Sequence, residues 1–179
     1  RDDVLAIKNE LERAEKAARA LFEELRSGTT VDSTLPDVRS PPRDVDLAPH
    51  TGRKGAAGAK VRVVEFADFQ CPYCSRAADA MRALAKRYGD QVEFGYRHFP
   101  LRGMHPDADR AAQAAQCAGR QGKFWEMHDR LYTAQHGLDA ESILGMGKEL
   151  GLDGAKLEGC LSKGEAAAEV ETDLQKGSE

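Results

Sequence analysis

Two cysteines separated by two residues are the side chains of this sequence best suited to chemistry. They begin and end the tetrapeptide Cys71-Pro72-Tyr73-Cys74. At this spacing one thiolate can form a mixed disulfide with another protein, and the second thiol can resolve it. The pattern predicts thiol–disulfide exchange, with Cys71 as the nucleophile and Cys74 as the resolving cysteine.

The elements on either side of this tetrapeptide would position both sulfurs. Residues 61–66 have the composition of a strand, and residues 75–88 have that of a helix. Pro72 suits the first helical position. Cys71 then lies at a helix N-terminus, where unpaired N–H groups and the helix dipole favour the thiolate. We expect Cys74, which lies farther inside the helix, to be the less exposed sulfur.

Glu65 is a carboxylate within the otherwise apolar strand, six positions before Cys71. Burial raises the pKa of a carboxyl group, which could then exchange a proton with Cys74 directly or through water. The alternative is a carboxylate at the strand end that faces solvent. We expect the proton-transfer role.

Other roles for the cysteine pair are a zinc site or two inert buried thiols. A structural zinc site needs four ligands, and the sequence has no second Cys-x-x-Cys and only scattered histidines. We therefore expect no metal and no cofactor. We expect His98, His105 and His128 to be structural or surface residues, although His98 could lie near the cysteines. Phe124 and Trp125 are expected to belong to a hydrophobic core.

The two remaining cysteines, Cys117 and Cys160, lie in predicted helices. A disulfide between them would close a loop of just over 40 residues and contribute about 4 kcal/mol. The alternative is two buried free thiols. Four cysteines, enough for two pairs, favour an oxidising compartment.

The rest of the chain suggests an α/β domain that continues into helices only. Residues 91–96 alternate as a second strand, so the β–α–β order predicts parallel strands with a right-handed crossover. Val45 and Leu47 indicate a short edge strand. From about residue 105 to 176 the pattern is helical throughout.

The N-terminal segment has a different pattern. Apolar residues at spacings of three and four over residues 3–26 predict an amphipathic helix at 1–27, and residues 28–42 resemble a linker. The helix could pack on its own domain or form a coiled coil, and we expect a homo-oligomer through residues 3–26. The main domain would then cover residues 43–179.

Composition excludes several classes of protein. The 179 residues carry a net charge of −4, which gives no reason to expect nucleic acid or an anionic membrane as partner. No apolar run is long enough to span a bilayer, and the N-terminus does not resemble a signal peptide. Because the sequence starts at Arg1 without Met, we expect a signal segment that is not visible here.

Three separated segments resemble DsbA-like thiol–disulfide oxidoreductases of the thioredoxin superfamily. They are residues 65–74 (EFADFQCPYC), 96–101 (YRHFPL) and 121–129 (QGKFWEMHD). The resemblance covers about residues 43–179 and implies a thioredoxin-like α/β fold with an all-helical insert. In it Cys71 and Cys74 match the redox pair, Glu65 matches the buried acid, and Cys117 and Cys160 match insert cysteines.

The resemblance also implies partners and a location. Relatives of this kind act on cysteine-containing client proteins, are reset by a membrane or soluble redox partner, and are periplasmic or otherwise extracytoplasmic. We therefore expect an enzyme that introduces disulfides into exported proteins. An alternative is a disulfide isomerase or reductase that oligomerises through the N-terminal helix.

One departure from the family pattern concerns the C-terminal part. The cis-proline loop, two strands and a closing helix of the superfamily should follow the insert, but the sequence ends at Glu179, and Pro100 and Pro106 are too early for the role. We expect these elements in a part of the protein that is not seen here. If the protein lacks them altogether, the alternative is a non-catalytic binding module.

Overall fold

The computed structural model describes residues 45–89 and 91–179, and those from Asp46 onward form one compact unit. The expected helix at residues 1–27 and linker at 28–42 lie outside the described residues. Within the described part of the chain, no helix combines the length and apolarity needed to cross a membrane.

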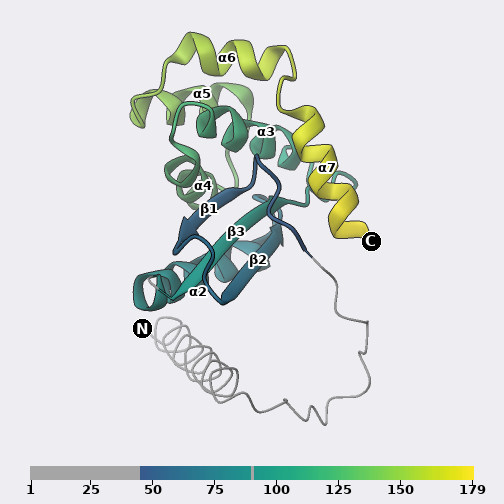
Figure 1. Ribbon diagram of the computed structural model, residues 1–179. Coiled ribbons are helices and arrows are strands. Elements are labelled where there is room, and N and C mark those ends of the chain that lie inside the picture. Colours follow the sequence, from purple (N-terminus) through teal and green to yellow (C-terminus); the bar gives the residue numbers. More distant parts are fainter. Residues whose placement is uncertain (1–44, 90) are drawn as a thin grey trace, which may run out of the picture. The chain divides into compact units, whose positions relative to one another are not determined.

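A sheet with the strand order β1-β3-β2 carries the site (Figure 1). Its strands are β1 (Gly52–Gly55), β2 (Val61–Ala67) and β3 (Val92–His98). β2 and β3 are parallel, whereas β1 is antiparallel to β3. The central strand β3 is buried at all seven positions. β2 pairs only with β3 among the described residues.

The predicted edge strand at Val45 and Leu47 is wrong. The edge strand β1 lies a few residues later and consists of Gly52, two cationic residues and Gly55. Leu47 instead lies across the sheet, where its side chain fills the space beside Gly95. The apolar side chain of Leu47 therefore packs on a face of the sheet and does not form its edge. The edge is polar, as is common for strands that end a sheet.

The helices follow the predicted order. α2 (Pro72–Tyr88) connects β2 to β3, and the chain then continues through five helices. These are α3 (Ala108–Gly119), α4 (Phe124–Thr133), α5 (Ala140–Glu149), α6 (Gly154–Ser162) and α7 (Ala167–Ser178). The parallel β2–α2–β3 unit and the helical block confirm the expected thioredoxin-like α/β class with a helical insert.

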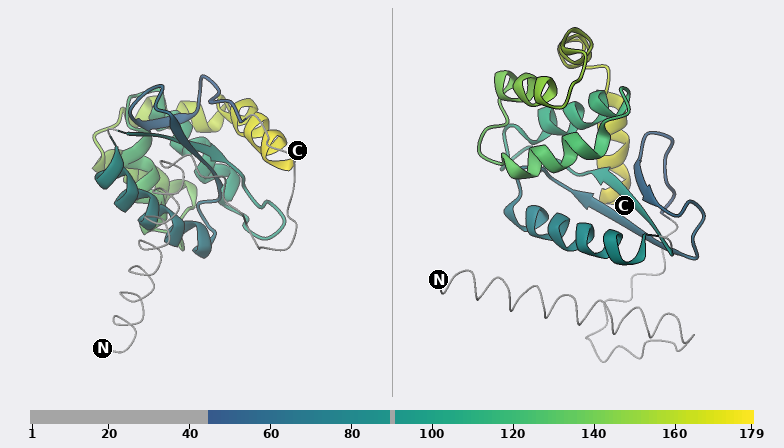
Figure 2. Two further views of the ribbon diagram at one scale, coloured as in Figure 1. Left: turned by 60° about the horizontal axis from the view of Figure 1, so that its bottom comes forward. Right: turned by 90° about the vertical axis from the view of Figure 1, so that its left-hand side faces the viewer.

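Alanines of α3 allow the helical block to pack closely. Ala111, Ala114 and Ala115 are fully buried, and α3 contacts α4, α5, α6 and α7. Figure 1 shows α3 to α6 gathered together and α7 returning toward the sheet, and Figure 2 shows the same arrangement from two other sides. A continuous hydrophobic core joins this block to the sheet and to α2.

The two faces of the sheet carry different chemistry. Glu65 of β2 and Tyr96 of β3 are partners in register, so their side chains share a face, and α2 and α4 cover this face. Arg97 points to the opposite face, where it pairs with Asp173 of α7. The redox cysteines follow β2 directly, at the start of α2.

Candidate redox site

Cys71 occupies the N-cap position of α2, and Pro72 is the first helical residue. The Cys71 carbonyl accepts the first helical hydrogen bond, from the Ser75 N–H at 3.1 Å. Cys71 and Cys74 are free thiols and both are partly exposed. Cys74 packs against the hydrophobic core. This is the geometry that the tetrapeptide predicted, with both cysteines at the helix N-terminus.

Asp68, three residues before Cys71, holds the loop that leads into the site. Its buried carboxylate accepts hydrogen bonds from the N–H groups of Gln70 at 2.7 Å and Leu101 at 2.8 Å. His105 Nδ1 lies 2.8 Å from the same carboxylate. The Cys71 N–H donates to the Asp68 carbonyl at 3.2 Å. The loop before Cys71 is therefore tied to the chain that follows β3.

Two glutamines fix the same loop to the helical block. Gln70 exchanges hydrogen bonds with Asp107 immediately before α3, through the Asp107 N–H at 2.6 Å and the carboxylate at 3.4 Å. Gln135, just after α4, donates to the carbonyls of Phe69 at 3.0 Å and Cys71 at 2.8 Å. The helical block thus positions the backbone of the candidate nucleophile.

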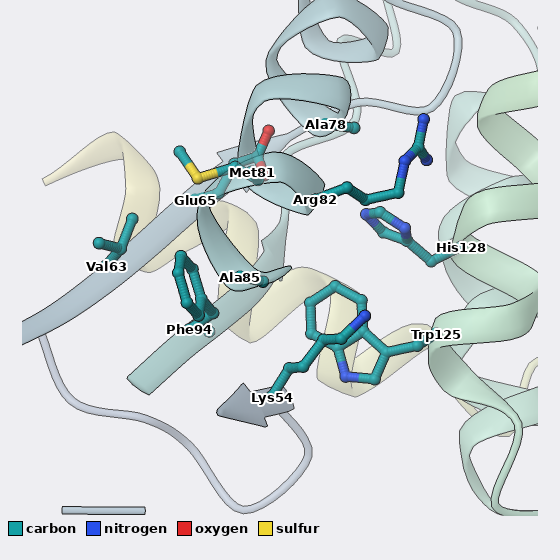
Figure 3. Close-up of a pocket in the computed structure, with 11 residues that line it drawn as sticks. Lys54, Val63, Glu65, Ala78, Met81, Arg82, Ala85, Phe94, Trp125 and His128 are labelled. Carbon is teal, nitrogen blue, oxygen red and sulfur yellow. The ribbon is translucent and has the colours of Figure 1, made fainter. Parts of the chain in front are cut away.

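Glu65 lies on the covered face of the sheet and lines a cavity between the sheet, α2 and α4 (Figure 3). Among the described residues it has no hydrogen-bond or ion-pair partner. Burial raises the pKa of its carboxyl group to about 7. The structure therefore places Glu65 in the desolvated environment that its sequence position suggested.

Cys74 and Glu65 interact electrostatically. Burial is the main cause that raises the pKa of Cys74 to about 11; the Asp68 N–H lowers it, while Cys71 and the Glu65 charge raise it further. The hydroxyl groups of Tyr96 and Tyr132 lie 3.0 Å apart, and burial also raises their pKa values. Cys74 is consequently protonated near neutral pH and needs a base in order to attack.

The three histidines that are predicted to be structural or surface residues differ in their surroundings. His105 is bound to Asp68 of the site loop. His98 is completely buried among aromatic rings, and neither ring nitrogen has a partner in the part of the chain that the structure describes. His128 is buried on α4 and lines the same cavity as Glu65. Phe124 and Trp125 pack in the core as expected, and Trp125 also borders this cavity.

Asp68, Gln70, Asp107 and Gln135 were not singled out from the sequence. Of these four residues, only Asp68 has a recognisable local pattern. An aspartate directly after a buried strand, three residues before the start of a helix, commonly accepts hydrogen bonds that hold the loop between them. The contributions of Asp107 and Gln135 depend on tertiary contacts across more than 30 residues.

The second cysteine pair has a different environment. Cys117 of α3 and Cys160 of α6 form a disulfide with their Cα atoms 6.0 Å apart, and both residues are buried. The bond links two helices of the block across 43 residues of sequence. No group of three or more His, Cys, Asp or Glu side chains in residues 45–89 and 91–179 is arranged to hold a metal ion.

Two solved structures with a similar fold are a thioredoxin-like oxidoreductase and a thiol-disulfide exchange protein. A thioredoxin-like oxidoreductase from Silicibacter pomeroyi DSS-3 is 29% identical, with a TM-score of 0.66 over 73% of this chain and 74% of that one. The thiol-disulfide exchange protein alpha-DsbA2 from Wolbachia pipientis is 20% identical, with a TM-score of 0.61 over 71% and 66% of the two chains. The second likeness concerns the fold alone.

Among curated proteins, the chain matches part of a larger one. It is 45% identical over 100 residues to the Na(+)/H(+) antiporter NhaA 1 of Salinispora arenicola, which is 56% of this chain and 15% of that protein. The chain thus spans a small fraction of the length of this relative.

The family model described as thioredoxin matches residues 48–179, which is most of the chain. The match begins before β1 and includes the site, its supporting loop and the whole helical block. The chain belongs to the thioredoxin family.

Proposed function

We propose that this protein is a thiol–disulfide oxidoreductase that introduces disulfides into exported proteins through Cys71 and Cys74. The observation that carries this proposal is the placement of both free thiols at the start of α2, beside the carboxyl group of Glu65, which has no partner among residues 45–89 and 91–179. The family membership and the fold of its structural neighbours support the same class of reaction.

In the oxidase direction, the protein begins with a Cys71–Cys74 disulfide. A client thiolate attacks Cys71 Sγ, a client–Cys71 bond forms, the Cys71–Cys74 bond breaks, and Cys74 leaves as a thiolate. A second client thiolate then attacks the client sulfur in the mixed disulfide and releases Cys71. The client loses two electrons, and the protein gains them as a dithiol.

Glu65 serves the proton transfer in this cycle. With a pKa of about 7, it is partly protonated at neutral pH and can both donate and accept a proton. Its acid form supplies the proton that the leaving Cys74 takes up. When a redox partner reoxidises the pair, the carboxylate form removes that proton again.

The proposed clients are exported proteins with reduced cysteines, and the proposed location is periplasmic or otherwise extracytoplasmic. The buried Cys117–Cys160 disulfide supports this location, because such bonds persist in oxidising compartments. A membrane or soluble redox partner is needed to withdraw the two electrons after each client.

Oxidation of a reduced two-cysteine peptide by the oxidised protein tests this function. We expect one peptide disulfide per Cys71–Cys74 disulfide consumed. Cys71→Ser should abolish the reaction, because no sulfur remains for the client to attack. With Cys74→Ser, a peptide carrying an activated disulfide should remain trapped on Cys71, because the resolving thiol is absent. Peptide oxidation at the uncatalysed rate by the wild-type protein would contradict the proposal.

A further inference from the structure

The cavity beneath α2 contains a second proton-active side chain that faces Glu65. His128 extends from α4 into this cavity, between Arg82 of α2 and Trp125, and Glu65 borders the opposite side (Figure 3). The cavity volume is about 20 Å³, which is enough for about one water molecule.

His128 has one satisfied and one unsatisfied ring nitrogen. Its Nδ1 lies 2.9 Å from an oxygen of Asp129, whereas its Nε2 is buried and has no partner among the described residues. The residue is only 3% exposed. Because a buried ring nitrogen normally has a hydrogen-bond partner, Nε2 indicates a place for a small polar ligand such as water.

Asp129 connects this histidine to solvent. Its side chain is 41% exposed and binds Arg82 at 3.1 Å. A series of exchangeable groups thus runs from the surface at Asp129, through the His128 ring, into the cavity that Glu65 lines. No other titratable residue among those lining the cavity has a buried nitrogen that lacks a partner.

We propose that His128 and Asp129, with a water molecule in this cavity, form the path by which protons reach and leave Glu65. The inference rests on the function proposed above and assigns a positioning and relay role to two residues of the helical block. Neither residue touches the reacting sulfurs.

The relay moves protons only, while the electrons stay with the sulfurs. When Cys74 resolves a mixed disulfide, its thiol proton passes to the Glu65 carboxylate, the Cys71–Cys74 bond forms, and the partner sulfur leaves as a thiolate. The Glu65 proton then passes through water to His128 Nε2. The imidazolium releases its Nδ1 proton to Asp129, from which solvent removes it. The opposite reaction uses the same path inward.

The groups around His128 lower its pKa, so the ring is neutral near pH 7 and its Nε2 carries the lone pair to which a proton can be transferred. Burial is the main cause that lowers its pKa; Arg82 and Lys54 lower it as well, and Asp129 opposes them. The other ionisable groups near His128 are Glu65 across the cavity and three aromatic side chains. The rings of Tyr96 and Tyr132 contact the His128 ring, and His98 contacts Tyr96.

The test uses the reduced protein and the thiol reagent DTNB. The first thionitrobenzoate is released as Cys71 attacks the reagent, and the second as Cys74 displaces the group on Cys71, so stopped-flow absorbance separates the two steps. We expect His128→Phe to slow the second release roughly tenfold at pH 7 and to change its pH profile, because an acid–base group is lost. The first release should stay within about twofold of wild type.

His98→Phe is the matched control, because His98 is also a buried histidine among aromatic rings and does not line the cavity. Both releases should keep their wild-type rates. A folded His128→Phe variant with the wild-type second rate and pH profile would overturn the relay. If that variant does not fold, Asp129→Asn decides: a slower second release supports the relay, and an unchanged one overturns it.

The failure of the relay and the failure of the proposed function are distinguishable. A wild-type protein that releases only one thionitrobenzoate lacks the resolving step, and both proposals fall. If the wild-type protein releases two, and Glu65→Gln slows the second release while His128→Phe does not, only the relay is wrong.

Discussion

The carboxyl groups of Glu65 in β2 and Asp173 in α7 lie on opposite faces of the same sheet, and their surroundings shift their pKa values in opposite directions. Asp173 is completely buried, yet it accepts hydrogen bonds from Arg97 Nε at 2.7 Å and the His98 N–H at 2.9 Å, and it lies 2.9 Å from His50 Nε2. Although burial alone would raise its pKa, these partners lower it. Glu65 is less buried and has a raised pKa, because burial acts on it and no described residue supplies a compensating partner.

Partners, more than depth of burial, therefore decide whether a carboxylate stays charged. On the Asp173 face the charge is fixed and attaches α7 to β3. On the Glu65 face the charge is free to change, as a proton carrier requires. A group that is paired for stability cannot also exchange protons near pH 7.

Asp173→Asn should give the largest effect on stability. It leaves the buried guanidinium of Arg97 without its main counterion, so we expect a loss of about 3–5 kcal/mol in the free energy of unfolding. Urea denaturation followed by circular dichroism would measure it. The matched control is Asp46→Asn, which removes an Arg97 partner that is 75% exposed and should cost less than about 1 kcal/mol. Equal losses in the two variants would contradict the comparison.

Glu65→Gln should stabilise the protein at alkaline pH. The folded pKa is raised from 4.5 to about 7, so the folded state binds more protons than the unfolded state in this range. The free energy of unfolding therefore falls as the pH rises from 4.5 through about 7. We expect the variant to gain roughly 2 kcal/mol over wild type at pH 8 and little at pH 5.

Glu93→Gln provides the contrast, because Glu93 is buried in β3 but paired with Arg62 and Arg53. We expect Glu93→Gln to lower the free energy of unfolding at pH 8, as Asp173→Asn does, because each substitution removes a charge that is paired with arginine. A Glu65→Gln variant that is less stable than wild type at pH 8 would show that Glu65 has stabilising partners there.

His98→Phe should remove an acid sensitivity. Burial lowers the pKa of His98 from 6.5 to about 4, so the unfolded state binds the extra proton first and stability falls as pH drops from about 6.5 toward 4. Between pH 7 and pH 5 this residue should account for a loss of about 2 kcal/mol, which the phenylalanine variant would not suffer. Urea midpoints at the two pH values, compared with wild type, measure the difference.

Local patterns predicted the redox part of the molecule well. The β2–α2–β3 unit and the position of Cys71 at the N-cap depend on strand periodicity and on Pro72, which are visible within a few residues. Glu65 was found because a carboxylate inside an apolar strand is unusual. These features are determined by neighbours along the chain.

Other features depend on residues that are far apart in sequence. The polar edge strand β1 carries no periodic signal, so the apolar residues Val45 and Leu47 predict an edge strand that does not form there. The hydrogen bonds of Gln135 to the site loop and the approach of His128 to Glu65 arise only when α4 packs against the sheet. A histidine on a helix gives no sequence sign of which cavity it will line.

The equilibrium between the Cys71–Cys74 pair and glutathione tests the central claim most directly. With Cys71→Ser as control, thiol labelling across a series of reduced-to-oxidised glutathione ratios gives the reduction potential. We expect a reversible two-electron transition at about −120 mV, the value of a strong thiol oxidant. A potential of about −200 mV or lower would contradict the oxidase assignment, and the absence of a reversible transition would contradict a redox function for these cysteines.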